Sequence, residues 1–442
     1  MNRSHGVILT IAVALATSAC ASSAGSGGEV VVTPTPAQGD YPPGLAQPSD
    51  NEVTARAGLL LAQIAGTADE AIQRQRGQEA LAIIETGLQQ DPMNPKLWLM
   101  KGQAAVAADQ YVVADSAFGR ALEIYPAYEP QIEAEREAAW IAAFNSGVRE
   151  MNAGDRQAAL ASLEMAGLIY DRRPEAQLNL ASLYLSEDRP EDAIAAYEAA
   201  LATMDSPAAA DLPAEIKADW PGFRELARAN IAQIYASMGV EHFRSEEYEE
   251  SAEDFSAALE INPYYRDALH NLAQSLYMRT TALEEDSAPV SDAVLVEAYE
   301  RFKDVAEQVR EIDPFNQNTN LFLARAYRGL GQHAETEAER DRWQREALRV
   351  LQENEALPFQ ITNVQVQLND STVEITGDLE NLNMEQGEQV TLRFSMLAAD
   401  GSVAGAEDVT VVTPAREQAT DFSVLVPVAE PALGWKYERV GI

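Results

Sequence analysis

Residues 98–126 read WLMKGQAAVAADQYVVADSAFGRALEIYP, and this stretch decides the fold. The small residues Gly102 and Ala105 let two helices cross closely, and the ring of Phe118 fills the gap that they leave. Pro126 ends the second helix, because proline lacks the amide donor that a helix interior needs. The stretch therefore predicts two packed helices joined by a short turn.

The same pattern recurs along the chain. Pro92 lies 34 residues before Pro126, and ALEIYP at residues 121–126 returns as ALEINP at 258–263. A helix pair cannot bury its apolar face alone, so pairs repeated at this period stack on their neighbours. Residues 51–357 are therefore predicted to form a mainly α solenoid of six to seven helix pairs, with insertions near 206–230 and 279–295.

This pattern resembles the tetratricopeptide repeat. The positions that carry the resemblance in the opening stretch are Trp98, Gly102, Ala105, Tyr111, Ala114, Phe118, Ala121 and Pro126. The resemblance implies a groove, lined by the first helix of each pair, that holds an extended peptide or helix of a protein partner. The positions that it assigns to the groove are Leu99, Gln103, Phe144, Val148, Met151, Asn152, Phe243, Arg244, His270, Gln274, Tyr277, Met278, Arg325 and Arg328.

Two interpretations of these groove residues stay open. The apolar ones either contact the partner or pack against the next repeat. Arg244, Arg325 and Arg328 are cations in a chain of net charge -38, and they favour a partner that bears carboxylates, because a guanidinium pairs with a carboxylate through two hydrogen bonds.

The last part of the chain changes its period from helical spacing to 2. Val364, Val366 and Leu368 alternate with polar residues, and Asn369-Asp370, Glu385-Gln386-Gly387 and Asp400-Gly401 supply turns. Residues 358–442 are therefore predicted to form a small all-β sandwich of six or seven strands. The run FSMLAADG resembles the FxLYD-type extracytoplasmic sandwich through Phe394 and Met396, while Leu397 and Ala398 depart from that motif.

The N-terminal residues have the layout of a secretory signal. Arg3 precedes an apolar run and small residues, so residues 1–19 are predicted to be a signal peptide. Thr17-Ser18-Ala19-Cys20 resembles a bacterial lipobox, which implies that Cys20 is lipidated; a plain signal peptide with a chance Cys is the alternative. Residues 20–50 are rich in Ser, Gly, Pro and Ala and are predicted to be a disordered linker. The resemblance to bacterial lipoproteins, with Ala21 rather than Asp after Cys20, implies sorting to the outer membrane, facing the periplasm.

Composition and motifs exclude several kinds of chemistry. Asp and Glu number 70 against 32 Lys and Arg, so the chain repels nucleic acid. Cys20 is the only cysteine, the histidines are scattered, and no phosphate loop, zinc motif or nucleophile elbow occurs. Adjacent acids such as Glu249-Glu250 are expected on a solvated helix face. No cofactor, no metal and no catalytic residues are predicted.

The leading hypothesis is a non-enzymatic scaffold, anchored to a membrane of the bacterial cell envelope through Cys20, that binds a protein partner in the groove. An assembly factor for an outer-membrane, pilus or secretion complex is a narrower alternative. A glycan-binding or enzyme accessory protein is a third. That last hypothesis relies on Trp435 and Tyr437, which share one face of a predicted strand because they are two residues apart.

Overall fold

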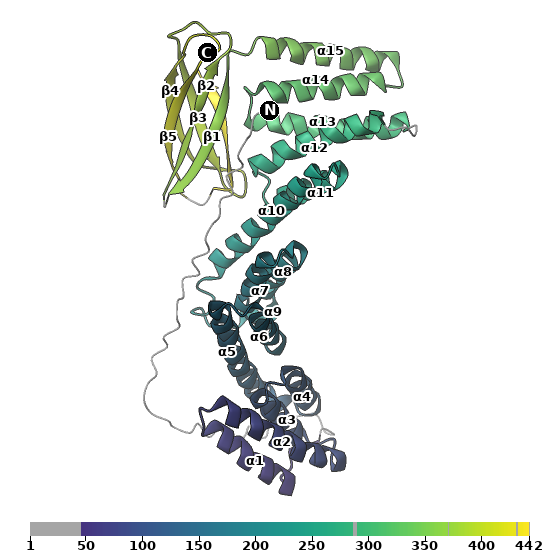
Figure 1. Ribbon diagram of the computed structural model, residues 1–442, viewed down its shortest axis with the longest axis vertical. Coiled ribbons are helices and arrows are strands. Elements are labelled where there is room, and N and C mark those ends of the chain that lie inside the picture. Colours follow the sequence, from purple (N-terminus) through teal and green to yellow (C-terminus); the bar gives the residue numbers. More distant parts are fainter. Residues whose placement is uncertain (1–45, 286–289, 370, 430–431, 442) are drawn as a thin grey trace. The chain divides into compact units, whose positions relative to one another are not determined.

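The fold was analysed in a computed structural model that describes residues 46–285, 290–369, 371–429 and 432–441. Over these ranges, helices run from Glu52 to Glu355 and strands from Phe359 to Val440 (Figure 1). The predicted signal peptide and Cys20, with most of the linker, lie outside the described residues. The predicted order, tetratricopeptide-like helix pairs followed by a β region, is confirmed.

The chain divides into two compact units, and the division passes through α4 and α5 rather than between helices and strands. The first unit runs up to Ala108 and includes Ser116–Glu133, and the second comprises Asp109–Asp115 and Ala134–Ile442. The first helices in chain order are α1 (Glu52–Ala65), α2 (Glu70–Gln90), α3 (Pro95–Ala107) and α4 (Tyr111–Ile124), followed by η1 (Pro126–Tyr128) and α5 (Glu129–Ala153).

The opening stretch forms α3 and α4, and the two helices meet at Gly102. A Cβ atom added to Gly102 would lie 2.3 Å from Cε1 of Phe118, so this position accepts only hydrogen as its side chain. Ala105, Phe118 and Ala121 are fully buried beside it. The small residues and the aromatic ring therefore have the roles that the sequence predicted for them.

The second unit continues with further helix pairs. Its remaining helices are α6 (Arg156–Ile169), α7 (Glu175–Ser186), α8 (Pro190–Asp205), α9 (Pro207–Ala210), α10 (Trp220–Arg244), α11 (Tyr248–Ile261), α12 (Arg266–Glu285), α13 (Asp292–Ile312), α14 (Gln317–Gln332) and α15 (Glu337–Glu355). Each pair packs on the next, and the largest core cluster spans α10 to α15.

Both predicted insertions are partly helical. Residues 206–230 contain α9 and the start of α10. Trp220, at the start of α10, packs with Met204 and Ala209 in a small buried cluster, and this packing stabilises the helical segments. In the second insertion, α12 continues to Glu285 and α13 begins at Asp292. The last helix, α15, begins at Glu337, because Thr336 and Glu339 form a capping box at its start.

The β region is a sandwich of two antiparallel three-stranded sheets with the orders β1-β2-β5 and β4-β3-β6. Its strands are β1 (Phe359–Asn369), β2 (Thr372–Asn381), β3 (Gln389–Leu397), β4 (Val403–Val412), β5 (Ala419–Pro427) and β6 (Gly434–Val440). The inward residues Phe394, Ile375 and Val426 are fully buried between the sheets. Gly387 and Gly401 have φ of 92° and 82°, as the predicted turns require.

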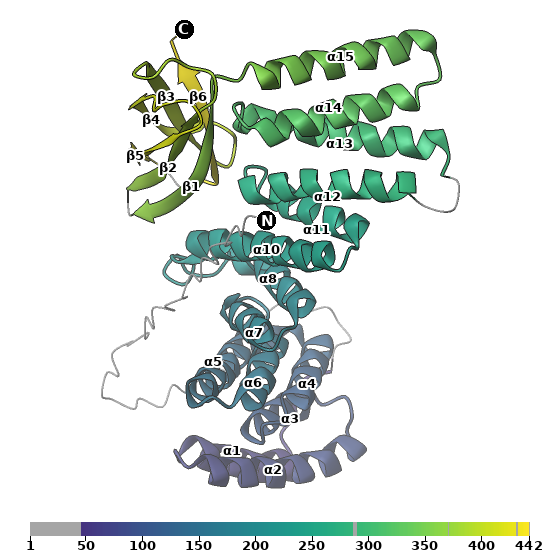
Figure 2. The same cartoon turned by 45° about the horizontal axis from the view of Figure 1, so that its top comes forward.

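The sandwich packs against the ends of the last helix pairs, as Figures 1 and 2 show. The loops that follow α11, α13 and α15 contribute to the contact. Asn262 donates to the carbonyl of Leu433 at 3.0 Å, and the ring of Phe315 stacks on Phe359 at 4.4 Å. After α15, Asn383 donates to the carbonyl of Leu357 at 2.9 Å. We call this contact the junction.

Candidate functional site

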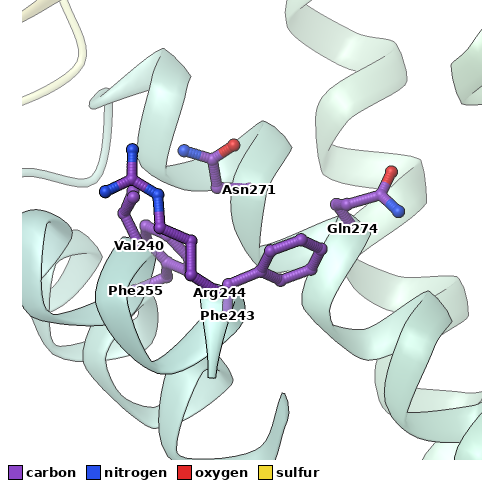
Figure 3. Close-up of a pocket in the computed structure, with 6 residues that line it drawn as sticks. All are labelled: Val240, Phe243, Arg244, Phe255, Asn271 and Gln274. Carbon is purple, nitrogen blue, oxygen red and sulfur yellow. The ribbon is translucent and has the colours of Figure 1, made fainter. Parts of the chain in front are cut away.

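A pocket of about 150 Å³ lies between α10, α11 and α12. Figure 3 shows its lining residues, with the ring of Phe243 directed toward the helix that carries Gln274. The lining consists of Val240, Phe243, Arg244, Phe255, Asn271 and Gln274. Two successive first helices, α10 and α12, therefore supply most of the pocket wall, as expected for a groove of this class.

The pocket combines an apolar floor with polar groups at its rim. Phe255 is buried, while Phe243 is half-buried and makes an edge contact with Tyr248 at 5.5 Å between ring centroids. The side chain of Arg244 is 69% exposed and donates to Glu241 at 2.5 Å. An ion pair this exposed contributes little stability, so the guanidinium can exchange Glu241 for a carboxylate of a partner.

The structure brings together three of the residues predicted for the groove. Phe243, Arg244 and Gln274 line the pocket. Asn152 is exposed near the end of α5. Tyr277 stacks on Phe322 of the next first helix at 5.5 Å, which is the packing role that was left open for apolar groove residues.

Arg325 is engaged within the chain. It donates to Oε2 of Glu284 at 2.5 Å, and the hydroxyl of Tyr299 donates to the other oxygen of the same carboxylate at 2.5 Å. Its side chain is only 20% exposed. The structure therefore pairs Arg325 with a carboxylate of its own chain, whereas Arg328 one turn later is exposed.

His270 lies at the junction, beside the buried carboxylate of Asp313. Asp313 is 3% exposed, and its Oδ2 is 3.5 Å from Nε2 of His270 and 2.5 Å from Nη2 of Arg266. The hydroxyl of Tyr437 donates to Oδ1 at 2.6 Å, and Asn316 donates to Oδ2 at 2.8 Å. One carboxylate thus ties α12 and the start of α14 to β6.

Burial and neighbouring charges perturb two groups at the junction. Burial, and secondly the charge of Arg266, lower the pKa of His270 from its ordinary 6.5 to about 4. Burial and the Asp313 carboxylate raise the pKa of Tyr437 well above its ordinary value. Near pH 7 His270 is therefore neutral, and Tyr437 keeps the proton that it donates to Asp313.

We expect His270 to make stability depend on pH. Between about pH 6.5 and 4, the unfolded chain binds a proton at His270 and the folded chain does not, so stability falls as the pH falls through this window. His270→Gln removes this contribution. The loss of Tm from pH 7 to 4.5 should be smaller in the variant than in the wild type, and equal losses in a thermal unfolding series would contradict the assignment.

Trp435 and Tyr437 do share one face of β6, but that face is core. They are 8% and 2% exposed, and the guanidinium of Arg266 lies 4.3 Å above the Trp435 ring. Neither ring is open to stack on a sugar. The glycan hypothesis therefore loses the residues on which it relied.

Sequence reasoning missed Val240, Phe255 and Asn271 as pocket residues. Phe255 lies on α11, and this position puts it beneath α10 and α12. On α12, Asn271 lines the pocket instead of the predicted His270, which is the residue before it. The signal for Asp313 was weaker: IDP at residues 312–314 stands where the preceding repeat has INP.

The described residues hold no cluster of three or more His, Cys, Asp or Glu side chains that could bind a metal ion. None of the helices in these ranges combines the length and apolar character that spanning a membrane requires. His242 lies 2.6 Å from Asp254 and 3.9 Å from Glu247. His333 lies 2.8 Å from Asp292 and 4.0 Å from Glu284.

Helix pairs packed through small residues and aromatic rings, with a pocket between first helices, define a helical-repeat protein. The particular repeat is the tetratricopeptide repeat, whose family model matches residues 174–202 and 232–265. These segments coincide with α7–α8 and with the second half of α10 followed by α11. Tetratricopeptide repeats therefore occupy these two segments, and such repeats typically bind other proteins.

Solved structures give only distant similarity. MamA is 16% identical over 48% of this chain and 92% of its own, with a TM-score of 0.21. YrrB, described as a TPR protein with an unusual peptide-binding site, is 14% identical over 50% of this chain and 91% of its own, at 0.20. A TPR repeats protein from Bacteroides fragilis is 14% identical over 58% of this chain and 98% of its own, at 0.25. Scores this low support no argument about function. No curated protein matches the chain.

Proposed function

We propose that this chain is a non-catalytic scaffold of the bacterial cell envelope that binds a peptide segment of a protein partner in the pocket between α10 and α12. The observation that carries the proposal is the convergence of Phe243, Arg244 and Gln274, which the repeat pattern assigned to a groove, on one pocket. The tetratricopeptide repeats of the chain support a protein as the ligand.

The pocket lining indicates the chemistry of the segment. Val240, Phe243 and Phe255 fit an apolar side chain, and Arg244 at the rim fits a neighbouring carboxylate through charge-assisted hydrogen bonds. The amides of Asn271 and Gln274 can bind the peptide backbone of the partner. A segment with an apolar residue beside an acidic residue or a terminal carboxylate satisfies all three.

A crosslinking pull-down from the source cells tests this pocket. We expect the double variant Phe243→Ala, Arg244→Glu to capture at least tenfold less partner than the wild type. The variant removes apolar contact and reverses the charge that faces a carboxylate. Arg228→Glu is the matched control, since it makes the same charge change at an exposed position of α10. Equal capture by wild type and double variant would move the binding site elsewhere.

The envelope location is part of the same proposal and rests on the sequence of the N-terminal residues. Lipidation of Cys20 would tether the folded part to a membrane. In the pull-down, Cys20→Ser tests this anchor: the variant should leave the membrane fraction and lack the mass of the acyl chains. A Cys20→Ser chain that fractionates as the wild type does would remove the anchor and leave the pocket proposal standing.

A further inference from the structure

The outer edge of β1 is the least protected strand edge of the sandwich. Of the four edge strands, β4 carries Glu407 and Asp408, β5 carries Asp421 and ends at Pro427, and β6 carries Lys436, Glu438 and Arg439. Charges and prolines at an edge prevent pairing with another chain. Residues 359–369, FQITNVQVQLN, contain neither.

The second half of β1 is also exposed on both faces. The pairing of β1 with β2 is interrupted by a bulge between Thr362 and Gln365. After the bulge, residues Gln365 to Asn369 pair regularly with β2. In this ladder Val366 and Leu368 lie opposite Ile375 and Val373, which are fully buried, yet Val366 is 37% and Leu368 is 64% exposed. Figure 2 shows this end of β1 on the side of the sandwich away from α12–α15.

We propose that the edge of β1 is a self-association surface, and that its occupant is β1 of a second copy of this chain, paired antiparallel about Gln367. Two copies of net charge -38 repel each other over most of their surface, so contact is favoured where ionisable groups are absent. A two-fold axis at Gln367 places Gln367 against its own copy and Val366 against Leu368. Amides then pair with amides and apolar side chains with apolar side chains.

The pairing closes after two copies, because β1 has only one free edge. The backbone groups that an edge strand leaves unpaired would bond across the axis, joining the two β1-β2-β5 sheets into one sheet of six strands. Salt should strengthen the association, since screening weakens the repulsion between the two acidic copies and leaves the uncharged contact intact.

Light scattering on the full chain with Cys20→Ser tests the proposal at about 100 µM, where even an interface of micromolar affinity is occupied. We expect the measured mass to show a dimer, and the fraction of dimer to increase with the salt concentration. Leu368→Lys should abolish the dimer, because it places a cation from each copy at the uncharged contact. Leu425→Lys is the control, at an exposed position of β5 in the same sheet. A monomer in wild type, or a dimer that survives Leu368→Lys, overturns the proposal.

A disulfide reports the register directly, since Cys20 is the only native cysteine. In the Cys20→Ser background, Gln367→Cys should give a covalent dimer on oxidation, and Leu425→Cys should not. Equal dimer yields from both variants would contradict pairing about Gln367. A chain that stays monomeric while Leu368→Lys loses a captured protein would assign the edge to a different partner and likewise overturn self-pairing.

Discussion

Asp313→Ala is expected to destabilise the second unit by about 3–5 kcal/mol, the range for removing one partner of a buried ion pair. The carboxylate accepts from Tyr437 and Asn316 and pairs with Arg266, whose side chain is 14% exposed. Without it, the guanidinium keeps only the carbonyl of Ile312 as an acceptor and its charge is unpaired, while the phenol hydroxyl of Tyr437 loses the carboxylate to which it donates. The sandwich should then separate from the helix ends before the helix pairs unfold.

Hydrogen exchange resolves where this loss occurs. Amides of β6 and of the first turns of α12 and α14 should exchange faster in Asp313→Ala, while those of α7 and α8 should not change. Asp341→Ala serves as the matched control, because it removes an exposed carboxylate of α15. Unchanged protection of β6 in Asp313→Ala would show that Phe315 and Phe359 hold the junction without the carboxylate.

Phe255→Ala should have an effect of similar size, about 3–5 kcal/mol, because it empties the space of a large buried ring. Phe255 is 1% exposed, in the core between α10, α11 and α12, and it also lines the pocket. The variant should lower the urea midpoint of the transition that reports on α10–α12, and the same cavity should weaken partner binding.

Phe243→Ala separates folding from binding at this site. Phe243 is only half-buried, so its removal should lower the free energy of unfolding by about 1 kcal/mol or less. The same variant should still weaken binding of the partner. Equal destabilisation by Phe255→Ala and Phe243→Ala would mean that the rim of the pocket is as much a part of the core as its floor.

The fold could be predicted because the residues that pack each helix pair lie close together in the sequence. Gly102 and Phe118 specify one helix crossing within a few residues of sequence, and alternation at Val364 and Val366 specifies a strand locally. The extent of α10 and α12 was not predictable in this way. Their extra turns depend on contacts such as that of Trp220 with Ala209, which only the folded chain brings together.

The candidate site shows the same limit at the level of single side chains. The repeat pattern placed Arg244 and Arg325 alike in the groove. Arg325 binds Glu284, a residue 41 positions away on the preceding first helix, whereas Arg244 binds its exposed neighbour Glu241. Asp313 belongs to no motif, and its burial depends on a strand 124 residues later.

The junction also has a mechanical consequence. A stack of helix pairs bends like a spring, because each repeat rotates slightly against the next. The sandwich touches the loops after α11, α13 and α15, so it connects three consecutive helix pairs and holds their spacing. We therefore expect the spacing of these braced repeats to change less than the spacing of the repeats that the sandwich does not touch.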